Sequence, residues 1–140
     1  MIPSGLSHSE TMTVAACHTV PKVADWPGFA DMPPVLATAM MIGFVEQTCI
    51  QALRPHLAPG QHSVGTMVEI THIAATPVGM DVTATVALIA AEGRSLTFRV
   101  TCHDAAGLIG EGIHKRALID QARFMDRVRD KAALIGGARA

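Results

Sequence analysis

The amino-acid sequence predicts an α+β fold in which a curved antiparallel sheet closes around one long helix. Three observations lead to this prediction. Residues 34–54 form an apolar run of the length expected for a long buried helix. Segments with the alternating pattern of strands follow this run, and short glycine-containing links join them. One further strand candidate precedes the helix, so the helix stands between a single strand and a run of strands.

The segment ahead of the helix combines a strand with a loop. Residues 10–20 alternate in part, which predicts a first strand. The stretch PKVADWPGFADMPP then contains four prolines with Trp26, Phe29 and Met32 between them, which indicates a loop that packs against the core. Beside a buried carboxylate, such a loop either covers a pocket or serves only for packing.

The helix predicted over 34–54 carries one carboxylate near its middle, Glu46. Its neighbours at helical spacing are apolar or small: Ile42, Gly43, Cys49 and Ile50. An ionised side chain rarely occupies such a face without a partner or a use. The run is nearly long enough to span a membrane, but Glu46, Gln47 and Gln51 fall inside it and no positive cluster flanks its start, so we expect a buried soluble helix.

Four strand candidates follow the helix, over residues 63–76, 80–91, 94–103 and 108–119. The links TPVG, AEG and DAAG favour antiparallel neighbours, so the four segments predict a meander. Within the first of them, His72 shares a face with Val68 and Ile70. From Asp120 onward apolar residues recur at helical spacing, which predicts a surface helix that frays in the final GGARA. This element order is that of a hot-dog fold.

Length and composition limit the possible functions. With 140 residues we expect a single domain, 1–140, with a core over about 10–128 and a C-terminal tail over 129–140. Apolar residues make up 49% of the chain and charged residues only 16%, which favours a homo-oligomer over a monomer. A net charge of -1 provides no basic field for nucleic acid or an anionic membrane.

The cysteines and the N-terminus indicate a cytoplasmic protein without a metal site. The three cysteines are odd in number and widely spaced, as expected for reduced thiols, and no pair has metal-ligand spacing. The first ten residues lack the basic and apolar regions of a signal peptide.

Glu46 and His72 are the two ionisable groups predicted to point inward from different elements. A carboxylate and an imidazole in one site of low dielectric can perform acid/base or nucleophilic catalysis, and the alternative is a structural buried pair. Thr38 lies eight residues before Glu46, about 12 Å along a helix, so it can meet His72 or a substrate near the helix start, unless it only packs or caps. Gly65 predicts a bulge or a close approach of a ligand to the backbone. Arg116 either pairs with a carboxylate or holds an anionic substrate, and a surface ion pair is its default role.

Three motifs carry a resemblance to a known family: VLATAMMIGFVEQTC, SVGTMVEITHIAATPVG and GEGIHKRALI. Over residues 20–128 they resemble the fluoroacetyl-CoA thioesterase and its close relatives in the hot-dog superfamily. The resemblance implies a homodimeric acyl-CoA thioesterase that needs no cofactor beyond the coenzyme A of its substrate. It also implies active-site roles for Thr38, Glu46 and His72, a place for Gly65 in the acyl pocket and one for Arg116 near the substrate path.

One residue departs from the family pattern. Met32 stands where the fluoroacetyl-specific enzyme carries a phenylalanine that covers the acyl group. Methionine is apolar and flexible, so a cover is retained but its specific packing changes. The sequence therefore predicts hydrolysis of a short-chain acyl-CoA, and fluoroacetyl-CoA is one candidate. The alternatives are a hot-dog hydratase acting on enoyl thioesters and a non-catalytic module that binds acyl-CoA.

Overall fold

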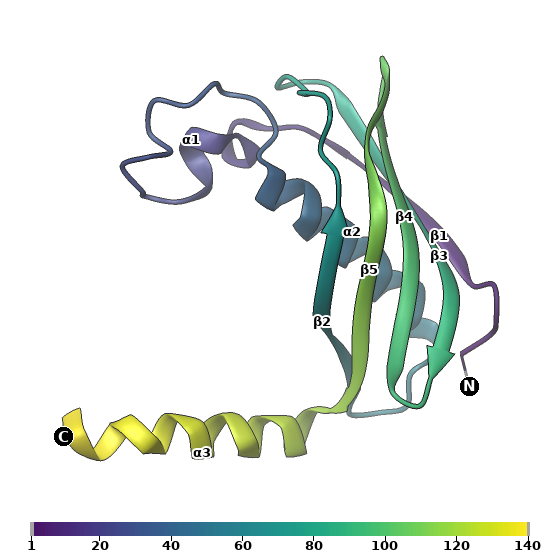
Figure 1. Ribbon diagram of the computed structural model, residues 1–140, viewed down its shortest axis with the longest axis vertical. Helices are drawn as coiled ribbons and strands as arrows, with labels where there is room; N and C mark the ends of the chain where they lie inside the picture. Colours follow the sequence, from purple (N-terminus) through teal and green to yellow (C-terminus); the bar gives the residue numbers. More distant parts are fainter. Residues whose placement is uncertain (1, 140) are drawn as a thin grey trace.

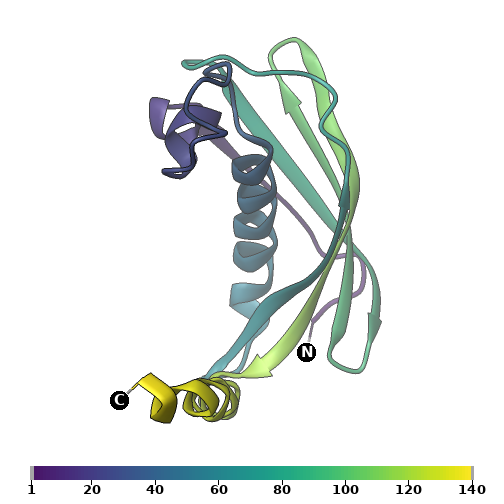
Figure 2. The same cartoon turned by 60° about the vertical axis from the view of Figure 1, so that its left-hand side comes forward.

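The alternating segments of the chain form a curved antiparallel sheet, and the apolar run forms a helix against its concave face (Figure 1; Figure 2). The computed structural model describes residues 2–139, with side chains to residue 136. Its strands are β1 (Ser7–Thr13), β2 (Gln61–Ile70), β3 (Asp81–Glu92), β4 (Ser95–Asp104) and β5 (Gly107–Asp120). Its α-helices are α1 (Val20–Val23), α2 (Thr38–Leu53) and α3 (Gln121–Arg139). The predicted α+β hot-dog architecture is confirmed.

The strand order β1-β3-β4-β5-β2 corrects the predicted meander. Strands β3, β4 and β5 do follow one another as antiparallel neighbours, but β2 pairs with β5 instead of β3. Both edges of β3 are occupied, one by β1 and the other by β4. Strand β2 therefore cannot pair with β3; it pairs along the outer edge of β5, and residues 71–80 carry the chain back across the sheet to β3.

Two strand boundaries also differ from the prediction. The first strand covers Ser7–Thr13 instead of 10–20, and the residues that follow form a 3-10 turn and the short helix α1, which has Pro21 in its first turn. Strand β2 ends at Ile70, so His72 lies beyond it. The backbone N–H of Thr71 still donates to the carbonyl of Glu111. The returning bond is different: the N–H of Glu111 donates to the Thr71 hydroxyl, where a regular strand pair would offer a backbone carbonyl. The same hydroxyl also donates to the Glu111 carbonyl.

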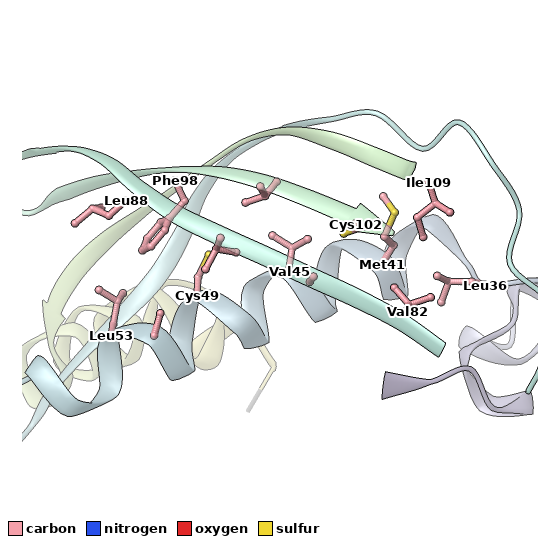
Figure 3. Close-up of a cluster of buried hydrophobic side chains, with 14 of the residues drawn as sticks. Leu36, Met41, Val45, Cys49, Leu53, Val82, Leu88, Phe98, Cys102 and Ile109 are labelled. Carbon is pink, nitrogen blue, oxygen red and sulfur yellow. The ribbon is translucent and has the colours of Figure 1, made fainter. Parts of the chain in front are cut away.

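Helix α2 packs on the sheet through one side only. Its buried residues recur every three or four positions: Met41, Val45, Thr48, Cys49, Ala52 and Leu53. They meet the apolar inner faces of β3, β4 and β5, among them Val82, Phe98, Cys102 and Ile109 (Figure 3). The expectation of a buried helix is wrong for one side of α2 in the single chain, because Gly43 and Gln47 are exposed on the side opposite the sheet.

The tail forms the helix α3, as predicted, and it extends away from the end of β5 (Figure 1). Its first turn is capped by Asp120, whose carboxylate accepts the backbone N–H of Arg123. The helix continues through the GGAR segment to Arg139 instead of fraying there. Within residues 2–139, no helix has the length and apolar character needed to cross a membrane.

Candidate active site

The first candidate group lies at the N-terminus of α2. Thr38 is the first residue of this helix, and the segment after β2 brings His72 beside it, with 2.7 Å between Thr38 Oγ1 and His72 Nδ1. Backbone N–H groups at a helix start point outward without helical partners. The pair therefore stands where a polarised oxygen can be bound.

The other ring nitrogen of His72 is unusual. Nε2 is buried and has no hydrogen-bond partner within residues 2–139. Burial lowers the pKa of His72 below its ordinary value of 6.5, against a smaller opposing effect of the Ala74 backbone. A neutral imidazole with one unpartnered nitrogen can exchange a proton with a bound substrate or water.

The second candidate group surrounds Glu46 on the next turns of α2. Arg116 of β5 is only 2% exposed, and its Nη1 lies 3.0 Å from Glu46 Oε2. The guanidinium also donates from Nε to Ser63 Oγ at 2.8 Å and from Nη2 to the Ser63 carbonyl at 2.9 Å. The Glu46 side chain is 39% exposed, so the carboxylate is anchored at one oxygen and remains accessible. Arg116 thus pairs with a carboxylate, as one of the two sequence-based alternatives predicted. Because its side chain is buried, it does not form the surface ion pair that is usual for an arginine.

Gly65 explains how the carboxylate reaches this position. The register of β2 against β5 shifts between Gly65 and Met67, which confirms the bulge. A Cβ atom on Gly65 would lie 2.8 Å from Glu46 Oε2 and 3.2 Å from His114 Cε1. The close approach is therefore made by the protein's own carboxylate, and only glycine leaves room for it.

Glu46 and His72 do not meet in the single chain. His72 bonds to Thr38, whereas Glu46 bonds to Arg116, and no hydrogen bond in the described part of the chain joins the two groups. The sequence predicted that Glu46 and His72 point inward from a helix and a strand toward one site, and it also left open a contact of Thr38 with His72 near the helix start, which the structure shows. Because β2 ends at Ile70, His72 lies level with the helix start, two turns from Glu46.

The loop between α1 and α2 is less packed than expected. Trp26 is 60% exposed and stacks edge-on with Phe29, with ring centroids 5.0 Å apart. Met32 is 43% exposed, and its N–H donates to the carbonyl of Phe29. The aromatic side chains of this loop thus pack on each other in place of the core.

Two residues of the Glu46 group, Ser63 and His114, were not predicted from the sequence as site residues. His114 stands two positions before Arg116 on β5, so the two side chains share a face, and this spacing was the available signal. Ser63 gave no such signal, because its partner Arg116 lies 53 residues away.

Cys49, one helical turn after Glu46, has a pKa raised to about 12 by burial, so its thiol stays protonated. Among residues 2–139, no cluster of three or more histidine, cysteine or acidic side chains could hold a metal ion.

The fold is that of solved hot-dog proteins of the thioesterase class. A hypothetical protein of Thermus thermophilus, described as a thioesterase superfamily member, superposes with a TM-score of 0.84 at 25% identity and covers 95% of each chain. A fluoroacetyl-CoA-specific thioesterase superposes with a TM-score of 0.91 at 40% identity, over 94% of this chain and 98% of that chain. A phenylalanine-to-alanine variant of the fluoroacetyl-CoA-specific thioesterase, solved with fluoroacetate and CoA, superposes with a TM-score of 0.85 at 41% identity, over 87% of this chain and 98% of that chain.

The sequence itself narrows the class to one family. Residues 12–122 match the sequence model of the fluoroacetyl-CoA-specific thioesterases. The curated fluoroacetyl-CoA thioesterase of Streptantibioticus cattleyicolor is 47% identical over 105 residues, which are 75% of this chain and 76% of that protein. The chain belongs to the fluoroacetyl-CoA-specific thioesterase family, and the resemblance inferred from its motifs is confirmed.

Proposed function

We propose that the protein hydrolyses a short-chain acyl-CoA, with fluoroacetyl-CoA as the first candidate substrate, to the free acid and CoA. Family membership supports the thioesterase class. The observation that carries the proposal is the Thr38–His72 pair at the start of α2, in which the buried Nε2 has no partner of its own. A thioester bound there would have its carbonyl oxygen polarised by helix N–H groups, and the free imidazole nitrogen would handle the proton.

Glu46 supplies the second chemical component. Its carboxylate either activates a water molecule or attacks the thioester carbonyl, which forms an acyl anhydride and releases the CoA thiolate. In the second route, water then cleaves the anhydride and regenerates the carboxylate. A single turnover in ¹⁸O-labelled water can reveal the anhydride route. If water attacks the carbonyl carbon of Glu46 in the anhydride, one labelled oxygen stays in the Glu46 side chain, whereas activation of water by Glu46 puts the label only into the released acid.

Thr38 and Arg116 have supporting roles in this proposal. Thr38 orients His72 or the attacking water, or serves itself as the nucleophile, and Arg116 holds one oxygen of Glu46. Gly65 and Met32 shape the acyl end of the site. The chemistry uses only these side chains and water, so we propose no cofactor, and CoA enters as part of the substrate.

We further propose that the working form is a homodimer in the cytoplasm. The outer side of α2 and the outer edge of β2 are uncovered in the single chain, and apolar side chains such as Trp26, Ile73 and Val78 are exposed. A second copy is the simplest cover for this surface. The three cysteines are free thiols, in keeping with a reducing compartment. Sedimentation equilibrium tests the dimer, and a monomeric mass at micromolar concentration contradicts it.

The deciding experiment measures thiol release from acetyl-, fluoroacetyl-, propionyl-, butyryl- and phenylacetyl-CoA. We expect rapid cleavage of one short acyl-CoA, and a loss of about 10²- to 10⁴-fold in kcat for Glu46→Gln with an unchanged circular dichroism spectrum. Near-normal turnover by the variant would remove Glu46 from the mechanism. Hydration of crotonyl-CoA without thiol release would show a hydratase, and tight binding without any turnover would show a binding module.

A further inference from the structure

The guanidinium that holds Glu46 is itself fixed by a buried histidine. His114 and Arg116 are 1% and 2% exposed, and both belong to β5. His114 Nε2 lies 3.1 Å from Arg116 Nη1, and His114 Nδ1 lies 2.8 Å from the carbonyl oxygen of Met67 on β2. Both ring nitrogens of this enclosed histidine thus have a protein partner, and these two contacts determine where its proton is.

The partners of the ring select one protonation state. The carbonyl of Met67 can only accept a hydrogen bond, so Nδ1 carries the hydrogen and donates it. Arg116 can only donate, so Nε2 must present its lone pair. His114 is therefore neutral in this arrangement. Burial has the largest effect and lowers the pKa of His114 below 6.5; the hydrogen bond to Met67 opposes this, the neighbouring guanidinium lowers the pKa further, and Glu46 has the smallest, opposing effect.

The hydrogens of Arg116 Nη1 are then both assigned. One points to Glu46 Oε2 at 3.0 Å and the other to His114 Nε2 at 3.1 Å. Ser63 holds the other edge of the guanidinium through Nε and Nη2. With His114 the Nη1 end has a fixed, buried acceptor beside the partly exposed Glu46; without it only the movable carboxylate holds this end, and the guanidinium can tilt together with it.

We propose that His114 is a positioning residue: as a neutral acceptor it orients Arg116 so that Nη1 points at the carboxylate of Glu46. His114 acts through Arg116 and touches no reacting atom. The inference rests on the proposed role of Glu46 in thioester hydrolysis. It assigns a use to a buried histidine that the mechanism otherwise leaves idle, and it explains why an imidazole that can gain a proton stands beside a buried cation.

Two substitutions separate the positioning role from simple packing. In His114→Gln the amide oxygen can occupy the region of Nε2 and accept from Arg116. In His114→Asn the shorter amide can still donate to the Met67 carbonyl but does not reach the guanidinium. We expect His114→Gln to keep kcat within about threefold of the wild type and His114→Asn to lose about tenfold to a hundredfold, with KM changed less than threefold in both. His103→Asn, on the exposed side of β4, is the matched control.

A double-mutant cycle tests whether the effect passes through Glu46. Where Glu46 is already glutamine, the further change His114→Asn should lower the residual kcat by less than threefold, because the group that it positions has lost its charge. Losses that multiply in the double variant, or equal losses in His114→Gln and His114→Asn, would overturn the proposal and leave His114 a packing residue.

A spectroscopic readout keeps this inference separate from the proposed function. Long-range ¹H–¹⁵N spectra of the imidazoles report the tautomer of His114 whether or not any acyl-CoA is cleaved. We expect the neutral Nδ1–H form at pH 7 in the wild type and in Glu46→Gln. The Nε2–H form or a protonated ring at pH 7 would contradict the positioning role. Absence of thiol release with the Nδ1–H tautomer present would instead contradict the proposed hydrolysis.

Discussion

The substitution Gly65→Ala should impair the site while leaving the fold intact. The added Cβ would lie 2.8 Å from Glu46 Oε2, whereas ordinary contacts of this kind begin near 3.4 Å, so the carboxylate must withdraw by about 0.6 Å. The same Cβ would lie 3.5 Å from Arg116 Nη1, so a withdrawal directly away from it lengthens the contact of the carboxylate with the guanidinium from 3.0 Å to about 3.2 Å. The hydrogen bond then lies at the upper end of its normal length, and the carboxylate is displaced mainly toward the open side of the site.

The expected effects on rate and stability differ in size. A displacement of about 1 Å in a reacting group can cost about a hundredfold in rate, so 0.6 Å should cost about tenfold to a hundredfold in kcat. The clash falls on the end of a flexible side chain, and the ion pair joins a buried guanidinium to a carboxylate that is 39% exposed; because this pair is lengthened and not broken, the loss should stay below about 1 kcal/mol. The lower conformational entropy of alanine in the unfolded chain offsets this loss by about 0.5–1 kcal/mol. The free energy of unfolding should therefore change by less than about 1 kcal/mol.

Thiol release and urea unfolding measure the two quantities on the same preparation. Gly136→Ala is the matched control, because a Cβ there meets nothing within 4 Å and the position lies in α3, far along the chain from the site. A Gly65→Ala variant with kcat within twofold of the wild type would show that the carboxylate need not lie against β2. A loss of several kcal/mol in stability would show that the backbone, and not Glu46, absorbs the clash.

Three further predictions follow from the same contacts. Thr38→Val keeps the shape of the side chain but removes the hydroxyl bonded to His72, so thiol release should fall about tenfold to a hundredfold while Thr38→Ser retains most of it; equal rates in both would exclude a role for the hydroxyl. The pKa values of His72 and His114 are both lowered from 6.5 by burial, so the unfolded chain binds more protons in acid. The stability from these two groups is complete above pH 6.5 and is lost as the pH falls through their folded pKa values; a urea midpoint that is flat from pH 7.5 to 5 would contradict this. Cys17 is exposed and the other two cysteines are buried, so a thiol reagent should label one cysteine per native chain and all three after unfolding, as counted by mass spectrometry.

Local patterns were sufficient for most of the secondary structure. The apolar run predicted α2, although the helix begins at Thr38 and not at residue 34, because Val35 and Leu36 form β-bridges. The alternating segments predicted β3, β4 and β5 to within a residue or two, and the spacing of apolar residues predicted α3. Each of these signals depends on neighbours within one or two helical turns or along one strand. The presence of a carboxylate at Glu46 on an apolar helix was equally visible, and the motifs around it were enough to indicate the family that the comparisons confirm.

Contacts between distant segments were not predictable in this way. Strand β2 cannot pair with β3 because β1 and β4 occupy both edges of β3, and no local pattern in residues 61–70 distinguishes the free edge of β5, where β2 pairs, from that of β1. The contact of His72 with Thr38 was one of the possibilities that the sequence left open for Thr38, and the end of β2 at Ile70 decides between them. The strand pairing therefore decides which side chains face Thr38 and Glu46 on α2.

The environment of Glu46 shows the same division most clearly. The sequence by itself determined that an ionisable group would lie on a largely apolar helix, because side-chain periodicity alone assigns residues to faces. The tertiary structure decided which partners it has: Arg116 lies 70 residues further along the chain, and its own partners Ser63 and His114 come from two different strands. Charges separated so far in sequence meet only after the sheet has closed around the helix, so the geometry that orients the carboxylate is a property of the fold.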